Sequence, residues 1–163
     1  MSSSDRRSFL TLLAAAPLAA CGFAPVYGPN GAGGALRDRL RIAPPDTRLG
    51  FVLVARLEDR LGRASAPTHA LGWEITTDER DLAITGTDDI TRTNVIGTLT
   101  FAVTEIGSDR TVQSGEVSTF TAYSTTGSPV STTAARRDAE DRLMVALADQ
   151  LVSRLLSGAS DWA

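Results

Sequence analysis

The sequence predicts an α+β fold, a two-layer sandwich in which a small, mainly antiparallel sheet of about four strands carries two helices packed on one face. Two observations predict it. Leucines recur every four residues in two separate segments, as on the apolar side of a helix. Between those segments, threonine-rich stretches alternate apolar and polar residues, as in strands with one buried face. The order strand, helix, strands, helix lets both helices cover the same sheet face.

Composition is that of one ordinary globular domain. The chain has 163 residues, of which 42% are hydrophobic and 21% charged. The net charge of -3 gives no support for binding nucleic acid. All 16 basic residues are arginine, which a GC-rich genome is enough to explain, although arginine also suits phosphate wherever several are clustered.

Residues 1–20 have the layout of a cleaved signal peptide. Arg6 and Arg7 precede an apolar run, residues 9–16, that is too short to span a bilayer. The paired arginines also match the twin-arginine export motif, and the sequence leaves that route and general secretion open.

The end of this segment, Leu-Ala-Ala-Cys at residues 18–21, resembles a bacterial lipobox. The resemblance implies that the Cys21 thiol receives a diacylglyceryl group, that the chain is cut before Cys21, and that the new amine is acylated. The thiolate is the nucleophile this needs, and acyl chains anchor a protein at about 0.8 kcal/mol per buried CH2. The alternative is a chance cysteine in a secretory signal. Cys21 is the sole cysteine, so no internal disulfide forms.

The mature chain begins with a tether and a first strand and helix. Residues 21–35 are predicted to be the lipidated N-terminus and a glycine-rich flexible tether, before a single domain over residues 36–157. Alternating apolar residues predict a strand at 37–42, which two prolines end. Asp46 or Thr47 then caps a helix over residues 47–61, and Gly62 ends it.

The middle of the chain is predicted to be a sheet. Residues 64–71 read as a loop with a solvated His69, because one histidine without a second ligand is no metal site. From Gly72 the pattern is that of a strand. The apolar side chains stand at odd positions at Trp73 and Ile75 but at even positions from Leu82 onward, which predicts a bulge or short turn at 78–81. A loop is predicted at 86–89.

The clearest strand is residues 91–105, followed by a hairpin turn at 107–110 and a return strand at 111–124. One face of the first strand is apolar, with Val95, Leu99, Phe101 and Val103. A loop over 125–130 leads to a cap at 131–133 and a helix from about residue 133 to residue 156. Residues 158–163, Trp162 included, are predicted to be frayed.

No catalytic constellation is visible in the sequence. There is no Gly-x-Ser-x-Gly elbow and no P-loop, and one histidine leaves no scope for a zinc cluster. The acids between residues 78 and 89 lack the spacing of a calcium loop. The sequence therefore predicts no catalytic residue, no metal and no cofactor other than the covalent lipid on Cys21, and it favours a binding or assembly role.

The residues from Cys21 onward read Cys-Gly-Phe-Ala-Pro-Val-Tyr. Cys-Gly-Phe-x-Pro-x-Tyr at a lipobox resembles the lipopolysaccharide-assembly lipoprotein family of the LptE type, and residues 91–103 and 139–143 are similar to its central strand and last helix. The resemblance implies an outer-membrane lipoprotein on the periplasmic side, without enzymatic activity. It would plug an LptD-type β-barrel translocon, assist its assembly, and bind lipopolysaccharide on its way to the outer leaflet.

Arginine binds phosphate through bidentate, charge-assisted hydrogen bonds. Arg92, on the outer sheet face, and Arg110, at the hairpin tip, are therefore the predicted lipopolysaccharide ligands, with Arg80 a weaker one. The alternative is that these arginines are ordinary solvated residues of the surface. The rival functions are another envelope binding module, such as a lipid carrier or a secretion-system pilotin, and, less favoured, an envelope hydrolase.

Overall fold

A computed structural model describes residues 28, 31–37, 39–83 and 90–162. The signal peptide, Cys21 and the predicted loop at 86–89 lie outside the described residues. The elements in order are α2 (Ala32–Leu36), β1 (Leu40–Ile42), α3 (Arg48–Leu61), β2 (His69–Ala83), β3 (Ile90–Glu105), β4 (Thr111–Ser124), α4 (Pro129–Gly158) and the 3-10 turn η1 (Ala159–Asp161).

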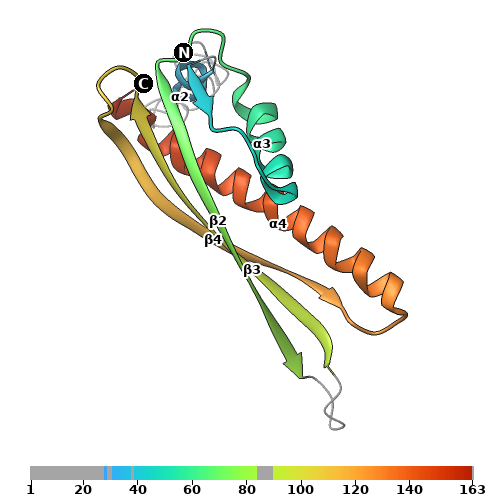
Figure 1. Cartoon of the computed structure of the whole chain (residues 1–163). Coiled ribbons are helices and arrows are strands. Elements are labelled where there is room, and N and C mark those ends of the chain that lie inside the picture. Colours follow the sequence, from blue (N-terminus) through green and yellow to red (C-terminus); the bar gives the residue numbers. More distant parts are fainter. Residues whose placement is uncertain (1–27, 29–30, 38, 84–89, 163) are drawn as a thin grey trace, which may run out of the picture.

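The sheet has the strand order β1-β2-β3-β4, with β1 parallel to β2 and the other neighbours antiparallel. The helices α3 and α4 lie on the same side of it (Figure 1). The predicted α+β sandwich is therefore confirmed, with a mixed sheet of four strands.

The three long strands make the molecule elongated. β3 has 16 residues, which span about 53 Å at ~3.3 Å per residue. The pairing of β2 with β3 runs from His69 opposite Glu105 to Leu82 opposite Arg92 and shifts only after Leu82. The bulge or turn predicted at residues 78–81 is therefore wrong. The apolar pattern changes from odd to even positions because this part of β2 runs beyond the apolar core. Leu82 therefore points to the opposite face of the sheet and is 38% exposed.

The two long helices begin at side-chain caps. In α3 the Thr47 hydroxyl accepts a hydrogen bond from the Gly50 amide at 3.1 Å, and the positive φ of Gly62 ends the helix, both as predicted. The helix α4 begins at Pro129, four residues before the predicted start, with Ser128 as its cap. A proline fits the first turn of a helix because its missing amide hydrogen needs no partner there.

The apolar core lies between the helices and the sheet, as the leucine periodicity predicts. The leucines that repeat at four-residue spacing in α4 are fully buried, and so are the alternate residues of β3 from Val95 to Val103. Beyond Val95 the core stops. We call the end with α2, β1, the hairpin at residues 106–110 and η1 the proximal end, and the end where β3 and α4 begin the distal end (Figure 1).

Three predictions fail at the proximal end, where segments expected to be loose are packed. Helix α2 begins at Ala32, within the predicted tether, and ends at Leu36, the first residue of the predicted domain, which is 1% exposed. The tail is not frayed at Trp162, whose indole Nε1 donates to Gln113 Oε1 at 2.9 Å. His69 is buried rather than solvated, with its ring 4.8 Å from that of Trp162 and its Nδ1 3.0 Å from the Thr68 hydroxyl. These side chains come together only through tertiary packing, so no local periodicity in the sequence predicts their contacts.

Candidate functional site

The candidate ligands Arg92 and Arg80 share one sheet face near the distal end. In the register of β2 and β3, Arg80 lies opposite Asn94 and Leu82 opposite Arg92, so both arginines belong to the set that faces away from the helices. We call this uncovered side of β2, β3 and β4 the open face. Both arginine side chains are exposed there, available to a ligand that lies against the sheet.

Arg92 lines a surface hollow of about 410 Å³ at the ends of β3 and β4, together with Thr91, Ala122, Tyr123 and Ser124. A second arginine reaches the same strand end, because Arg142 of α4 donates through Nη2 to the Ala122 carbonyl at 3.2 Å. Arg142 thus bonds the backbone of a residue that lines the hollow, although Arg142 is not itself among the lining residues. Helical spacing alone assigns Arg142 to a solvated face, although it lies within the stretch 139–143 that carries the family resemblance.

Arg110 is not part of this group. It sits in the proximal hairpin, beyond Glu105, and the thirteen residue steps of β3 from Arg92 to Glu105 correspond to about 43 Å. Its Nη2 lies 3.4 Å from Glu105 Oε2. The hydrogen bond from Ser108 and the charge of Arg110 lower the pKa of the Glu105 carboxyl. Arg110 and Arg92 therefore do not form one site.

Arg80 is also partly engaged, because its Nε lies 3.1 Å from Asp78 Oδ2. The other acids of this stretch have partners as well. Asp81 accepts a hydrogen bond from the buried Thr93 hydroxyl at 2.6 Å. These acids, predicted to lie in a turn, belong to a continuous strand and take part in its side-chain pairing.

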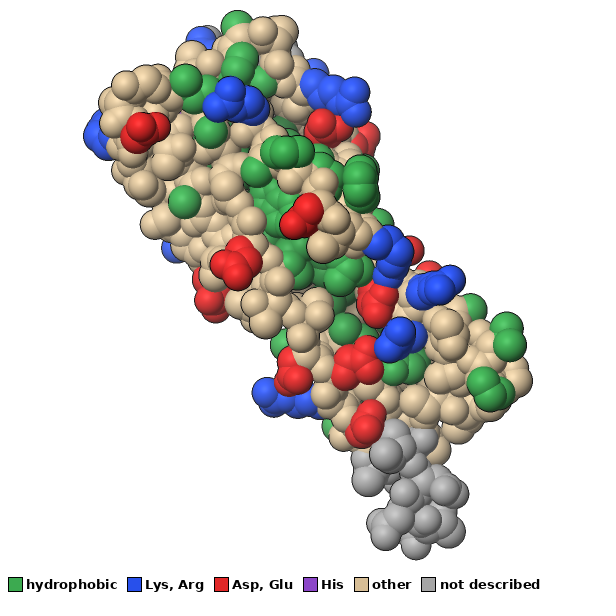
Figure 2. All heavy atoms as spheres, in the orientation of Figure 1, with side chains coloured by type: hydrophobic (Ala, Val, Ile, Leu, Met, Phe, Trp, Pro, Cys, Tyr) green, Lys and Arg blue, Asp and Glu red, His purple; other side chains and the backbone are tan. Residues whose placement is uncertain are grey.

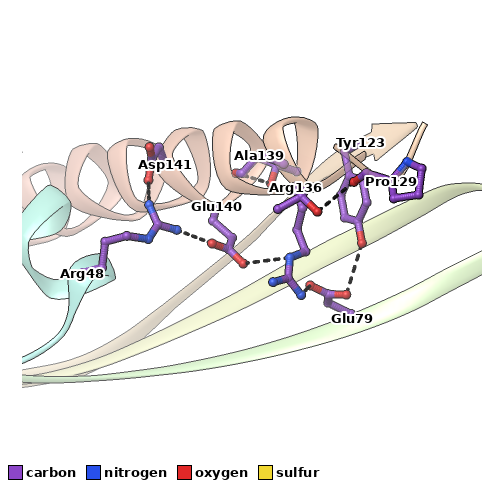
Figure 3. Close-up of polar contacts among 10 residues, drawn as sticks. Arg48, Glu79, Tyr123, Pro129, Arg136, Ala139, Glu140 and Asp141 are labelled. Atoms are coloured by element: carbon purple, nitrogen blue, oxygen red, sulfur yellow. Dashed lines mark hydrogen bonds and ion pairs between the residues drawn. The ribbon is translucent and has the colours of Figure 1, made fainter. Parts of the chain in front are cut away.

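On the helix side of the sheet, a chain of polar contacts joins four elements at the border of the core (Figure 3). Arg48 of α3 pairs with Glu140 and Asp141 of α4, and Arg136 lies 3.7 Å from Glu140 and 3.9 Å from Glu79 of β2. We call this set, with Tyr123, the ion-pair chain. It ties both helices to the strands where apolar contacts have run out.

Tyr123 of β4 completes this chain by donating its hydroxyl to Glu79 at 3.3 Å. Burial raises the pKa of the Tyr123 phenol, the neighbouring Glu79 carboxylate raises it further, and a hydrogen bond with Thr93 opposes the rise. The phenol therefore holds its proton more tightly in the folded protein, as a donor to a carboxylate requires.

The open face is polar in its middle. Thr98 lies there between Thr76 and Ser118, and Thr100 lies between Glu74 and Glu116. Large apolar side chains are exposed on this face as well: Phe120, at 63%, lies opposite Ile96, and Leu82, at 38%, lies near the distal end. This face offers hydroxyl groups, carboxylates and apolar side chains to whatever covers it.

The described residues bring no three histidine, cysteine or acidic side chains together as a metal site. None of the described helices is long and apolar enough to cross a membrane. The described residues form an elongated α+β sandwich with one open sheet face and exposed arginines toward both ends.

The chain belongs to the LptE family, described as lipopolysaccharide-assembly, whose family model matches residues 33–155. The family is one of lipoproteins without enzymatic activity, which agrees with the predicted binding or assembly role. No curated protein sequence matches the chain.

Solved structures share this fold at low sequence identity. A Caulobacter crescentus CB15 protein assigned as a lipoprotein is 18% identical with a TM-score of 0.63, covering 79% of this chain and 96% of its own. The rare lipoprotein B of Shewanella oneidensis is 14% identical with a TM-score of 0.57, covering 73% and 92%. A minor lipoprotein of Acinetobacter baumannii is 17% identical with a TM-score of 0.53, covering 73% and 89%.

Proposed function

We propose that the protein is an outer-membrane lipoprotein, anchored on the periplasmic side by lipid on Cys21. Its body occupies the lumen of an LptD-type β-barrel translocon, assists assembly of that barrel, and binds lipopolysaccharide during insertion into the outer leaflet. Family membership over residues 33–155 supports a place in lipopolysaccharide assembly. The structural similarity to two lipoproteins supports the α+β fold that such a lipoprotein would have.

The observation that carries the proposal is the open face. Three strands of 15, 16 and 14 residues present one face that no described helix covers. A long polar surface of this kind fits the inner wall of a wide barrel, whose lining is polar. An antiparallel sheet can leave one face to solvent, and inside a barrel this face would become an interface.

The lipopolysaccharide part of the proposal rests on the distal arginines. Arg92 has no ion-pair partner among the described carboxylates and lines the distal hollow. The phosphate groups of a glycolipid match the planar fork of a guanidinium group. Arg80 lies on the same face and has to exchange Asp78 for a phosphate. Arg110, at the opposite end, is left outside this revised site.

Recovery of partners from detergent-solubilised outer membrane tests the barrel assignment. A tagged chain should co-purify with one large β-barrel protein and retain it through extensive washing. A chain recovered alone, while other outer-membrane complexes survive the same detergent, would favour a separate lipid carrier or a pilotin.

Charge reversal tests the ligand assignment. The double substitution Arg80→Glu and Arg92→Glu should weaken lipopolysaccharide binding in vitro by about tenfold or more, because two phosphate contacts become repulsive. Arg110→Glu is the matched control, since it reverses an exposed arginine at the other end of the sheet. Equal weakening by both variants would point to a general charge effect and remove Arg80 and Arg92 from the site.

A further inference from the structure

We propose that the proximal end is a second membrane contact, which binds the head group of an anionic phospholipid in the leaflet that holds the lipid anchor. Arg39 and Arg41 would bind the phosphate, and the hollow beside Arg41 would take the glycerol and the first part of the acyl chains. This inference rests on the proposed lipidation of Cys21. It concerns a ligand and a surface different from those proposed for lipopolysaccharide.

Many arginines along the body are engaged by carboxylates. Arg48, Arg56 and Arg142, for example, form ion pairs with carboxylates of α3 or α4, although Arg92 and Arg137 have no partner among the described carboxylates. Arg39 and Arg41, at the start of the domain, are exposed, and no described carboxylate pairs with them. Their charges therefore remain available for an external anion.

Two carboxylates near the proximal end are already engaged by other arginines. Glu58 pairs with Arg63 at 2.8 Å, and Glu105 pairs with Arg110 at 3.4 Å. Asp109 and Asp161 also lie at this end and are exposed, and Figure 2 shows arginine and acidic side chains together there. The positive charge available to a ligand is therefore that of Arg39 and Arg41 themselves, with which no described carboxylate pairs.

A hollow lies directly beside Arg41. It has a volume of about 390 Å³, and its lining includes Arg41, Pro44, Ala70, Gly72, Ala102 and Thr104. The register places Arg41 next to Ala70 and Gly72 opposite Ala102, so small residues form an apolar floor on the open face. A cationic group at the rim of an apolar floor suits an amphiphile with a phosphate head, whereas free phosphate would leave the floor unused.

The chain connection keeps this end close to the bilayer. Gly28 is seven residues from Cys21, a reach of at most about 25 Å in a fully extended chain. The Gly28 carbonyl accepts a hydrogen bond from the Gly31 amide at 2.9 Å, at the start of α2, and α2 contacts α4 and η1. A lipid on Cys21 would therefore keep the start of the domain, which leads to Arg39 and Arg41, within about 25 Å of its own leaflet.

Vesicle binding by the full mature chain with Cys21→Ser, which lacks the lipid, tests the contact. Vesicles of phosphatidylethanolamine and phosphatidylglycerol should bind the protein at low salt, and vesicles of phosphatidylcholine alone should not. Arg39→Gln with Arg41→Gln should weaken binding roughly tenfold, because each arginine near an anionic surface contributes to the affinity. Arg136→Gln with Arg137→Gln removes two exposed charges near the start of α4, away from the proximal end, and should leave vesicle binding unchanged.

Filling the hollow gives a test that leaves net charge unaltered. A side chain at Gly72 has room, because its Cβ would meet only the Ala102 carbonyl oxygen, at 3.8 Å. Gly72→Leu should lower binding to the anionic vesicles while circular dichroism and the unfolding midpoint remain those of the parent chain.

Three results would overturn the proposal. They are no binding to anionic vesicles, equal loss in both double-arginine variants, and displacement by inorganic phosphate alone, which would identify a free-anion site. None of these results affects recovery of the β-barrel partner. A failure of this inference is therefore distinguishable from a failure of the proposed function.

Discussion

The proximal and distal halves of the molecule are held together by different chemistry. Around β1 and the second half of β3, leucines from α3 and α4 interlock with Leu99 and Val103 at almost no exposure. Toward the distal end, none of the first ten residues of α4, residues 129–138, is buried. There the ion-pair chain and single hydrogen bonds connect helix to strand.

Because of this difference, most of the folding stability comes from the proximal half, whereas the distal half presents polar and charged groups at the surface. Burial of apolar area is the dominant source of folding free energy, whereas exposed ion pairs contribute about 0–1 kcal/mol each. The distal end therefore keeps its polar and charged groups on the surface at little gain in stability. Arg92 and Arg142 can be changed there without removing the core that holds the fold.

The largest expected effect comes from opening the proximal core. Leu99 is fully buried in β3, so Leu99→Ala should lower the free energy of unfolding by about 2–5 kcal/mol through lost burial and a cavity. Leu82→Ala is the matched control, since Leu82 is 38% exposed near the distal end, and it should cost less than about 1 kcal/mol. Urea unfolding measures both. Similar losses would mean that the two halves are equally packed.

A smaller effect is expected from the closure of the proximal end by the tail. Trp162 contacts His69 and donates to Gln113, so Trp162→Ala should lower the unfolding free energy by about 1–3 kcal/mol. Trp162→Phe keeps the ring against His69 and loses only the hydrogen bond, at a cost of about 1 kcal/mol. Unfolding midpoints that stay at the wild-type value in both variants would show that the tail is frayed after all.

The two halves also differ in how well the sequence predicts them. Residues 91–105, the hairpin and the leucine-rich helices follow from alternation and four-residue spacing, because one buried face imposes a period on the sequence. Residues 78–83 lie beyond the core, so no buried face imposes an alternating pattern there, and the shift of apolar residues in β2 was wrongly interpreted as a bulge or turn. The predictions for His69 and Trp162 were wrong for another reason, since the packing of these two side chains depends on a contact between residues far apart in the chain.

The candidate site was predicted in part. Arg92 and Arg80 lie on the same face, as strand parity requires, but only the register of three strands shows that Arg110 belongs to the other end. Arg142 was missed as a neighbour because a helical pattern gives the face of a residue, not the strand end that it reaches. Lipidation of Cys21 stays a prediction.

The smallest effect, and the one specific to the distal half, concerns Tyr123. At neutral pH, Tyr123→Phe removes one hydrogen bond to Glu79, and the unfolding free energy should fall by about 1 kcal/mol or less. In the wild-type protein the pKa of the phenol is raised above 10.0, chiefly by burial and further by Glu79. The folded state therefore binds this proton more tightly than the unfolded state does.

The stabilisation from Tyr123 is consequently complete below pH 10.0 and is lost as the pH rises through the raised pKa of the folded state. Urea unfolding of the wild type and of Tyr123→Phe, followed from neutral to alkaline pH, should show the wild type losing its advantage only in that alkaline range. A constant difference between wild type and Tyr123→Phe at all pH values would contradict a raised pKa at this position. It would also mean that the ion-pair chain does not shield the phenol from solvent, and the distal half would then be more open than its contacts indicate.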